Sequence, residues 1–227
     1  MTKGLWTKDI QKARAIQNSL SKKVRIVPLK KKIRFIAAVD ASFIDDKVIA
    51  VATLFRYPEL ENIQDIIAVE KVLFPYIPGF LTFREGPAIV AAIKKLRIQP
   101  DLILFDGQGI AHPRGIGIAS HLGVILNIPT IGCAKSRLVG EFKEPGIECG
   151  SRKGLFYNGK KVGAVLRTRT NVKPVFVSPG HMIDIKSSIE IVMKCISQYR
   201  IPEPLRRADR LSKRHKKALM RRVIKKD

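Results

Sequence analysis

Two short apolar runs stand out in the sequence because each is followed directly by an aspartate. Leu102 to Phe105 is a continuous apolar stretch, which is typical of a strand buried on both faces of a parallel sheet. Ile33 to Val39 is mostly apolar as well, and the two runs lead into Asp106 and Asp40. Ligands of open α/β sheets bind beyond the carboxyl ends of the strands. Two such strand ends therefore predict two carboxylates side by side.

Other hydrophobic periodicities predict strands and helices around this pair. The first strand continues into a three-strand antiparallel meander with tight turns at Asp45-Asp46 and Pro58-Glu59. The order of elements predicts an α/β fold with a mixed central sheet flanked by helices. Without a visible linker or repeat, residues 1–210 are expected to form one catalytic domain, followed by a basic tail at 211–227. Helices are predicted at 7–21, 86–97, 116–126 and 183–199, and further strands at 47–55, 66–74, 129–132, 153–157, 161–168 and 174–178.

Composition adds a strong preference for anionic partners. The net charge of +24 and the pI near 10.3 favour polyanions, with nucleic acid as the first candidate and an acidic membrane surface or a ribosome as alternatives. No apolar run has transmembrane length and no signal peptide is visible, so we expect a soluble, cytoplasmic protein without membrane contact. Cys133, Cys149 and Cys195 lack C-x-x-C spacing, which argues against disulfides and zinc and predicts small apolar residues.

A third acid, Glu85, extends the two strand-end aspartates to a triad. It shares a helix face with Ile89 and would point toward the sheet. Thr82-x-x-Glu85 also matches a capping box, although Pro87 argues against it because proline fits best at the first helical position. Clustered carboxylates repel one another unless a cation lies between them, and Mg²⁺ prefers oxygen ligands. The triad therefore predicts a divalent metal site suited to phosphodiester chemistry.

Several longer motifs resemble a known family. They are Pro75–Glu85, Asp106–Gly109, His112–Arg114, Ala134–Ser136 and Pro202–Arg206. Together they resemble endonuclease V, the deoxyinosine 3′-endonuclease, over about residues 8 to 210. The resemblance implies a ribonuclease-H-like fold and a monomeric DNA-repair enzyme that uses Mg²⁺, or alternatively Mn²⁺. It also implies hydrolysis of the second phosphodiester bond 3′ to inosine, leaving 3′-hydroxyl and 5′-phosphate ends.

The resemblance also assigns roles to individual residues. It implies metal binding by Asp40, Glu85 and Asp106, and a wedge formed by Pro75 to Gly79, whose aromatic ring fills the gap left by an extruded base. Lys135 would stabilise charge beside the scissile phosphate, and His112 would contact phosphate or relay a proton. The implied substrate-binding residues are Tyr76, Pro78, Gly79, Arg84, Gly107, Gly109 and Ser136.

Several alternatives remain open at this stage. Asp209 either completes the metal surroundings, as an Asp or His does at this distance from the Pro-Glu-Pro motif in the family, or forms an i,i+4 salt bridge with Lys213. Taken alone, Lys135 is also compatible with a solvated lysine, Tyr76 with an ordinary loop aromatic and His112 with a structural hydrogen-bonder. Two rival functions are an inosine-specific endoribonuclease and a non-catalytic basic nucleic-acid-binding protein, and the sequence does not separate DNA from RNA.

Overall fold

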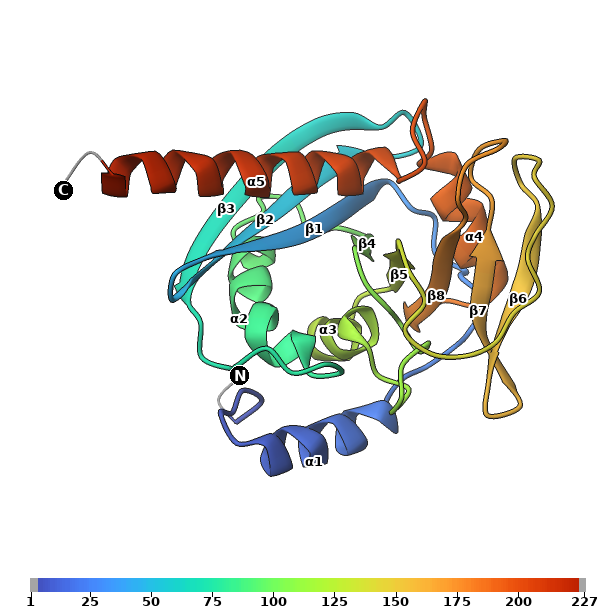
Figure 1. Ribbon diagram of the computed structural model, residues 1–227. Coiled ribbons are helices and arrows are strands. Elements are labelled where there is room, and N and C mark those ends of the chain that lie inside the picture. The colour runs from blue at the N-terminus through green and yellow to red at the C-terminus, as the bar shows by residue number, and fades with distance from the viewer. Residues whose placement is uncertain (1–3, 225–227) are drawn as a thin grey trace.

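The chain forms strands and helices within residues 4–224, the part that the computed structural model describes (Figure 1). The strands are β1 (Phe35–Ile44), β2 (Lys47–Arg56), β3 (Glu61–Lys71), β4 (Leu102–Phe105), β5 (Thr130–Ala134), β6 (Arg152–Tyr157), β7 (Lys160–Leu166) and β8 (Val175–His181). The helices are α1 (Ile10–Ser21), α2 (Leu81–Lys94), α3 (Ile118–Leu126), α4 (Ile185–Lys194) and α5 (Glu203–Ile224).

All eight strands belong to one mixed sheet with the order β3-β2-β1-β4-β5-β8-β7-β6. The pairs β1–β4 and β4–β5 are parallel, and the other neighbouring pairs are antiparallel. The predicted meander is the antiparallel β1-β2-β3 unit, and the predicted mixed sheet between helices is confirmed. Within residues 4–224 no helix is long and apolar enough to cross a membrane.

Helices cover both faces of the sheet (Figure 1). Val39 and Phe105 pack in a buried cluster with α2 and α3, whereas Ala38 and Leu104 pack on the opposite face with α4 and the start of α5. Successive side chains of a strand point to opposite faces. Asp40 lies two residues after Ala38 in the same strand, so its side chain points to the same face of the sheet. This is the face on which α5 lies.

The first strand is longer than predicted. It continues from Asp40 to Ile44 because its antiparallel pairing with β2 extends to the turn, whereas its parallel pairing with β4 ends at Val39. Asp40 is therefore not a strand-end residue in β1 itself. It lies at the end of the parallel β1–β4 ladder, which is the position that matters for its distance from Asp106.

Helix α2 also begins earlier than predicted, at Leu81 instead of residue 86. Pro87 lies inside it and cannot donate the usual backbone hydrogen bond. Burial of Phe83 and Ile89 on the same helix offsets that loss. Phe80 is the N-cap and makes no side-chain capping bond, so the capping-box interpretation of Thr82 and Glu85 is wrong.

The C-terminal half departs from the prediction in three places. Helix α4 ends at Lys194 instead of residue 199, and its capping residue Cys195 bonds back to the last turn. The basic segment after residue 210 continues helix α5 to Ile224, and α5 crosses β1 and β2 (Figure 1). Cys133 and Cys195 are buried as predicted, but Cys149 is exposed.

Candidate active site

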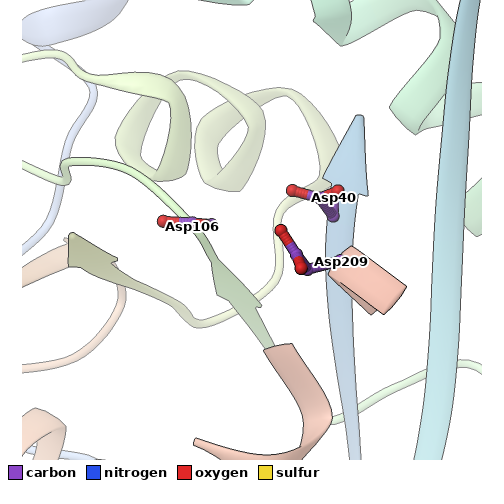
Figure 2. A group of neighbouring side chains, drawn as sticks. All are labelled: Asp40, Asp106 and Asp209. Atoms are coloured by element: carbon purple, nitrogen blue, oxygen red, sulfur yellow. The ribbon is translucent and has the colours of Figure 1, made fainter. Parts of the chain in front are cut away.

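Three aspartates from separate elements meet at one end of the parallel ladder (Figure 2). Asp40 comes from β1, Asp106 directly follows β4, and Asp209 lies on α5. One carboxylate oxygen of each lies within 4.8 Å of the other two. The first two are neighbours because Val39 and Phe105, the residues before them, are paired in register. Three carboxylates at this distance repel one another unless a cation compensates them, and an all-oxygen donor set fits a hard divalent ion.

Asp209 lies in the acidic cluster and also forms the predicted i,i+4 salt bridge. Its Oδ1 lies 3.9 Å from Lys135 Nζ, and its Oδ2 lies 2.8 Å from Lys213 Nζ one helical turn later. The i,i+4 pair is solvent-exposed on the lysine side and contributes only a few tenths of a kcal/mol. A pair this weak leaves the Asp209 carboxylate free to interact with other groups.

Two further side chains hold the cluster in place. Lys135 Nζ lies 2.5 Å from Asp106 Oδ2, and the buried hydroxyl of Ser212 donates to Asp40 Oδ2. Burial opposes the charged form of Lys135, but the hydrogen bond and the charge of Asp106 raise its pKa overall. The ammonium group therefore stays protonated beside the acids.

Glu85 is close to the cluster but outside the group of three. Burial raises the pKa of Glu85 to about 8, and the charges of Asp40 and Asp106 add to the effect. Burial likewise raises the pKa of Asp40 to about 6, although the Ser212 hydrogen bond opposes it. Without a cation, both groups hold a proton up to near-neutral pH. A bound divalent ion would favour their ionised forms, so the donor set fits a metal.

The raised pKa of Glu85 predicts a pH-dependent stability in metal-free protein. Between its ordinary pKa of 4.5 and its folded-state pKa of about 8, the folded state binds more protons than the unfolded state. The free energy of unfolding should therefore fall as pH rises through this window. Glu85→Gln removes this contribution, so its melting temperature should fall less between pH 5 and pH 8 than that of wild type.

This prediction is checked by thermal unfolding in chelator at both pH values. Glu70→Gln is the matched control, because Glu70 is exposed on β3 and the substitution should leave the wild-type pH dependence unchanged. An identical pH dependence in wild type and Glu85→Gln would contradict a protonated Glu85.

The loop Pro75–Gly79 is held by one carbonyl group. The Gly79 oxygen lies 2.9 Å from Gln17 Nε2, 3.1 Å from His112 Nε2 and 2.7 Å from an Arg114 guanidinium nitrogen. The Arg114 amide donates to His112 Nδ1, so His112 Nε2 carries the proton and donates to Gly79. Burial lowers the pKa of His112 to about 4, and the ring is neutral. Both contacts of the His112 ring are hydrogen bonds to the backbone, as expected for a histidine with a structural role.

A pocket of about 360 Å³ separates this loop from the strand ends. Tyr76, which is 70% exposed, stands at its rim. The pocket brings together most of the predicted site residues with three apolar side chains that sequence reasoning did not identify. Its lining includes Tyr76, Pro78, Gly79, Asp106, Gly107, His112, Lys135 and Ser136, together with Leu81, Ile118 and Leu138.

Two predicted substrate-binding residues lie outside that lining and serve the scaffold. Arg84 donates to the Phe74 carbonyl at 3.2 Å and stacks on Phe43. Gly109 packs so closely on β8 that a Cβ atom would lie 2.1 Å from the Pro179 carbonyl oxygen. Both residues therefore make scaffold contacts in this structure.

Gln17 and Ser212 were not found from the sequence, although Gln17 left a signal there. It lies between Ala13 and Leu20 on the buried face of α1, where a polar side chain needs a partner. Ser212 leaves no such signal, because it lies in a strongly basic segment whose pattern predicts a solvated tail. Its contact with Asp40 depends on how α5 crosses the sheet.

Comparison with known proteins gives a consistent result. The family model described as Endonuclease V matches residues 18–210. Endonuclease V of Dictyoglomus turgidum is 51% identical over 199 residues, which cover 88% of this chain and 87% of that protein. The crystal structure of endonuclease V from Streptomyces avermitilis superposes with a TM-score of 0.90 at 39% identity, covering 95% of this chain and 96% of the other.

A further solved structure contains nucleic acid. Ciona intestinalis endonuclease V, in complex with a 24mer DNA containing an inosine followed by a ribo-adenosine, superposes with a TM-score of 0.80 at 25% identity. The superposition covers 92% of this chain and 98% of that one. The likeness to the endonuclease V structures confirms the ribonuclease-H-like fold expected from the sequence motifs.

Proposed function

Because the chain belongs to the endonuclease V family and is thus a nuclease acting on phosphodiester bonds, we propose that it cuts nucleic acid beside inosine with the aid of a divalent cation. The cut falls at the second phosphodiester bond 3′ to the inosine and leaves 3′-hydroxyl and 5′-phosphate ends. The observation that carries the proposal is the convergence of Asp40, Asp106 and Asp209 next to a pocket rimmed by an exposed tyrosine.

The cation is held by Asp40, Asp106 and Asp209, with the Glu85 carboxyl nearby. Mg²⁺ is the ion proposed, with Mn²⁺ as a substitute, since both accept carboxylate oxygens. When bound, such an ion polarises the phosphate and activates water. The Lys135 ammonium, beside Asp106 and Asp209, is placed to stabilise negative charge that develops on the phosphate oxygens.

Base recognition is assigned to the pocket under the Pro75–Gly79 loop. A base extruded from the helix enters the pocket, and the Tyr76 ring takes its place in the stack. Pro78 and Gly79 form part of the wall, with the Gly79 carbonyl fixed by the Gln17–His112–Arg114 bonds. Gly107 belongs there because a Cβ would collide with Ile118 at 2.7 Å. A rigid wall is what discrimination between similar bases requires.

The substrate proposed is inosine-containing DNA, with inosine-containing RNA as the alternative. The net charge of +24 supports binding to either backbone. The Ciona complex contains a DNA in which a ribonucleotide follows the inosine, so it supports both DNA and RNA as candidate substrates. We further propose that the protein acts as a monomer in the cytoplasm.

A nicking assay tests the proposal. Matched duplexes with inosine or adenine at one position, in DNA and in RNA, are incubated with Mg²⁺, with Mn²⁺ or with chelator. We expect cuts only in inosine strands and only with a metal present. Product mapping should place each cut between the first and the second nucleotide on the 3′ side of the inosine. Equal cutting of adenine strands, or full activity in chelator, would contradict the proposal. Binding without cutting under every condition would favour the non-catalytic rival.

A further inference from the structure

A second pocket borders the acidic cluster on the side of α5. It has a volume of about 380 Å³, and it shares Asp106 and Lys135 with the base pocket while also containing Asp209. The rest of its lining comes from residues 199–213, which connect α4 to α5 and form the first half of α5. Asp106 thus lies where two pockets of different composition meet.

The second pocket is basic where the first is largely apolar. Five basic side chains line it against only two acids, Asp106 and Asp209. Lys135 and Lys213 are paired with those acids, but Arg210 is exposed and has no ion-pair partner among the described residues. A free guanidinium beside a cluster that handles phosphodiesters is suited to binding a phosphate group.

The same pocket contains an aromatic platform. The Arg206 guanidinium carbon lies 3.2 Å from the centroid of the Tyr199 ring, and Glu203 holds Arg206 in place at 2.6 Å. Tyr199 is 43% exposed despite this contact. Arg200 forms a fixed wall, since its guanidinium donates to the Lys135 and Pro174 carbonyls at 2.9 and 2.7 Å. Aromatic rings and guanidinium planes are the surfaces on which unpaired bases stack.

We propose that this pocket binds the nucleotide on the 3′ side of the scissile bond. Its base stacks on the platform that Tyr199 and Arg206 form together, and Arg210 contacts its 3′ phosphate. The inference rests on the proposed function. If the inosine base occupies the first pocket and the cut lies farther along in the 3′ direction, the strand must leave the acids on their other side, and the α5 pocket is the space adjoining them there.

Chemically altered substrates test the two contacts separately. One inosine DNA carries an abasic tetrahydrofuran in place of the nucleoside just beyond the cut, and another carries a neutral methylphosphonate at the next phosphate. With wild type, each change should lower kcat/KM about tenfold through loss of one stacking or one charge contact. The Tyr199→Ala variant should cut the abasic and the normal substrate at equal rates. The Arg210→Ala variant should cut the methylphosphonate and the normal substrate at equal rates.

Arg221→Ala is the matched control, because Arg221 is exposed on the same helix but outside the pocket. It should retain the wild-type response to both altered substrates. If Tyr199→Ala and Arg210→Ala still lose about tenfold on the altered substrates, the pocket does not hold this nucleotide, even though inosine-directed cutting stands. Absence of inosine-directed cutting by wild type would instead refute the proposed function.

Discussion

Asp106→Ala should lower the rate of inosine-directed cleavage by at least about 10³-fold while the protein remains folded. The carboxylate directly follows β4, makes the shortest contact of the cluster with Lys135, and borders both pockets. Under the proposed function, its loss removes a ligand of the cation, and it also removes the carboxylate that contacts the Lys135 ammonium. Electrostatic stabilisation by a metal supplies several kcal/mol at the transition state, and each 1.36 kcal/mol of it corresponds to about a tenfold change in rate.

Two measurements distinguish loss of the site from loss of the fold. Single-turnover cleavage gives the rate, and thermal unfolding with and without Mn²⁺ reports metal binding through the stabilisation it produces. Asp46→Ala is the matched control, because Asp46 is exposed in the β1–β2 turn, where it pairs with Lys71 at 3.6 Å. The control should behave as wild type in both experiments. Unchanged metal-dependent nicking by Asp106→Ala would remove Asp106 from the proposed site.

The pairing of Asp40 with Asp106 could be predicted because it depends on local pattern and sheet geometry alone. Two buried apolar runs, each leading into an acid, became adjacent parallel strands with Val39 and Phe105 in register. The prediction held although β1 continues past Asp40 to the turn. The end of the shared parallel ladder, and not the end of the strand, determined where the two carboxylates lie.

The contribution of α5 could not be predicted in the same way. The sequence after residue 202 is strongly basic and reads locally as a solvated end, yet it forms a long helix across the sheet. A two-point ion pair between Arg207 and Asp65 of β3 fixes its position. That tertiary contact joins residues far apart in the chain, and through it Asp209 and Ser212 reach Asp40. Local periodicity contains no information about such a contact.

The predicted helix boundaries are wrong where tertiary packing overrides local sequence preferences. Pro87 suggested that the second helix starts at residue 86, whereas burial of Phe83 in an aromatic cluster with Phe74 and Phe80 draws the preceding turn into the helix. The consequence is functional. Glu85 becomes a residue within the helix, partly buried near the two strand acids, instead of a capping residue at the helix start.

Tyr76→Ala should reduce the preference for inosine over adenine by about 5- to 150-fold in binding, corresponding to about 1–3 kcal/mol for one aromatic stacking contact. The ring is largely exposed at the rim of the base pocket and stands in a loop framed by Pro75 and Pro78. Prolines limit the backbone conformations of the loop, and the Gly79 carbonyl is anchored by Gln17 and its neighbours. The side chain is therefore presented to a ligand at little entropic cost.

The measurement is the dissociation constant for matched inosine and adenine duplexes in chelator, so that no strand is cut. Tyr76→Phe retains the ring without its hydroxyl group and should preserve the wild-type preference, which separates stacking from hydrogen bonding. Because phosphate contacts set affinity while base contacts set specificity, Tyr76→Ala should change binding to plain duplex little. If the alanine variant discriminates as well as wild type, the Pro75–Gly79 loop is not the wedge, and the pocket walls alone must read the base. If it loses affinity for both duplexes equally, Tyr76 contributes to general binding and not to recognition of inosine.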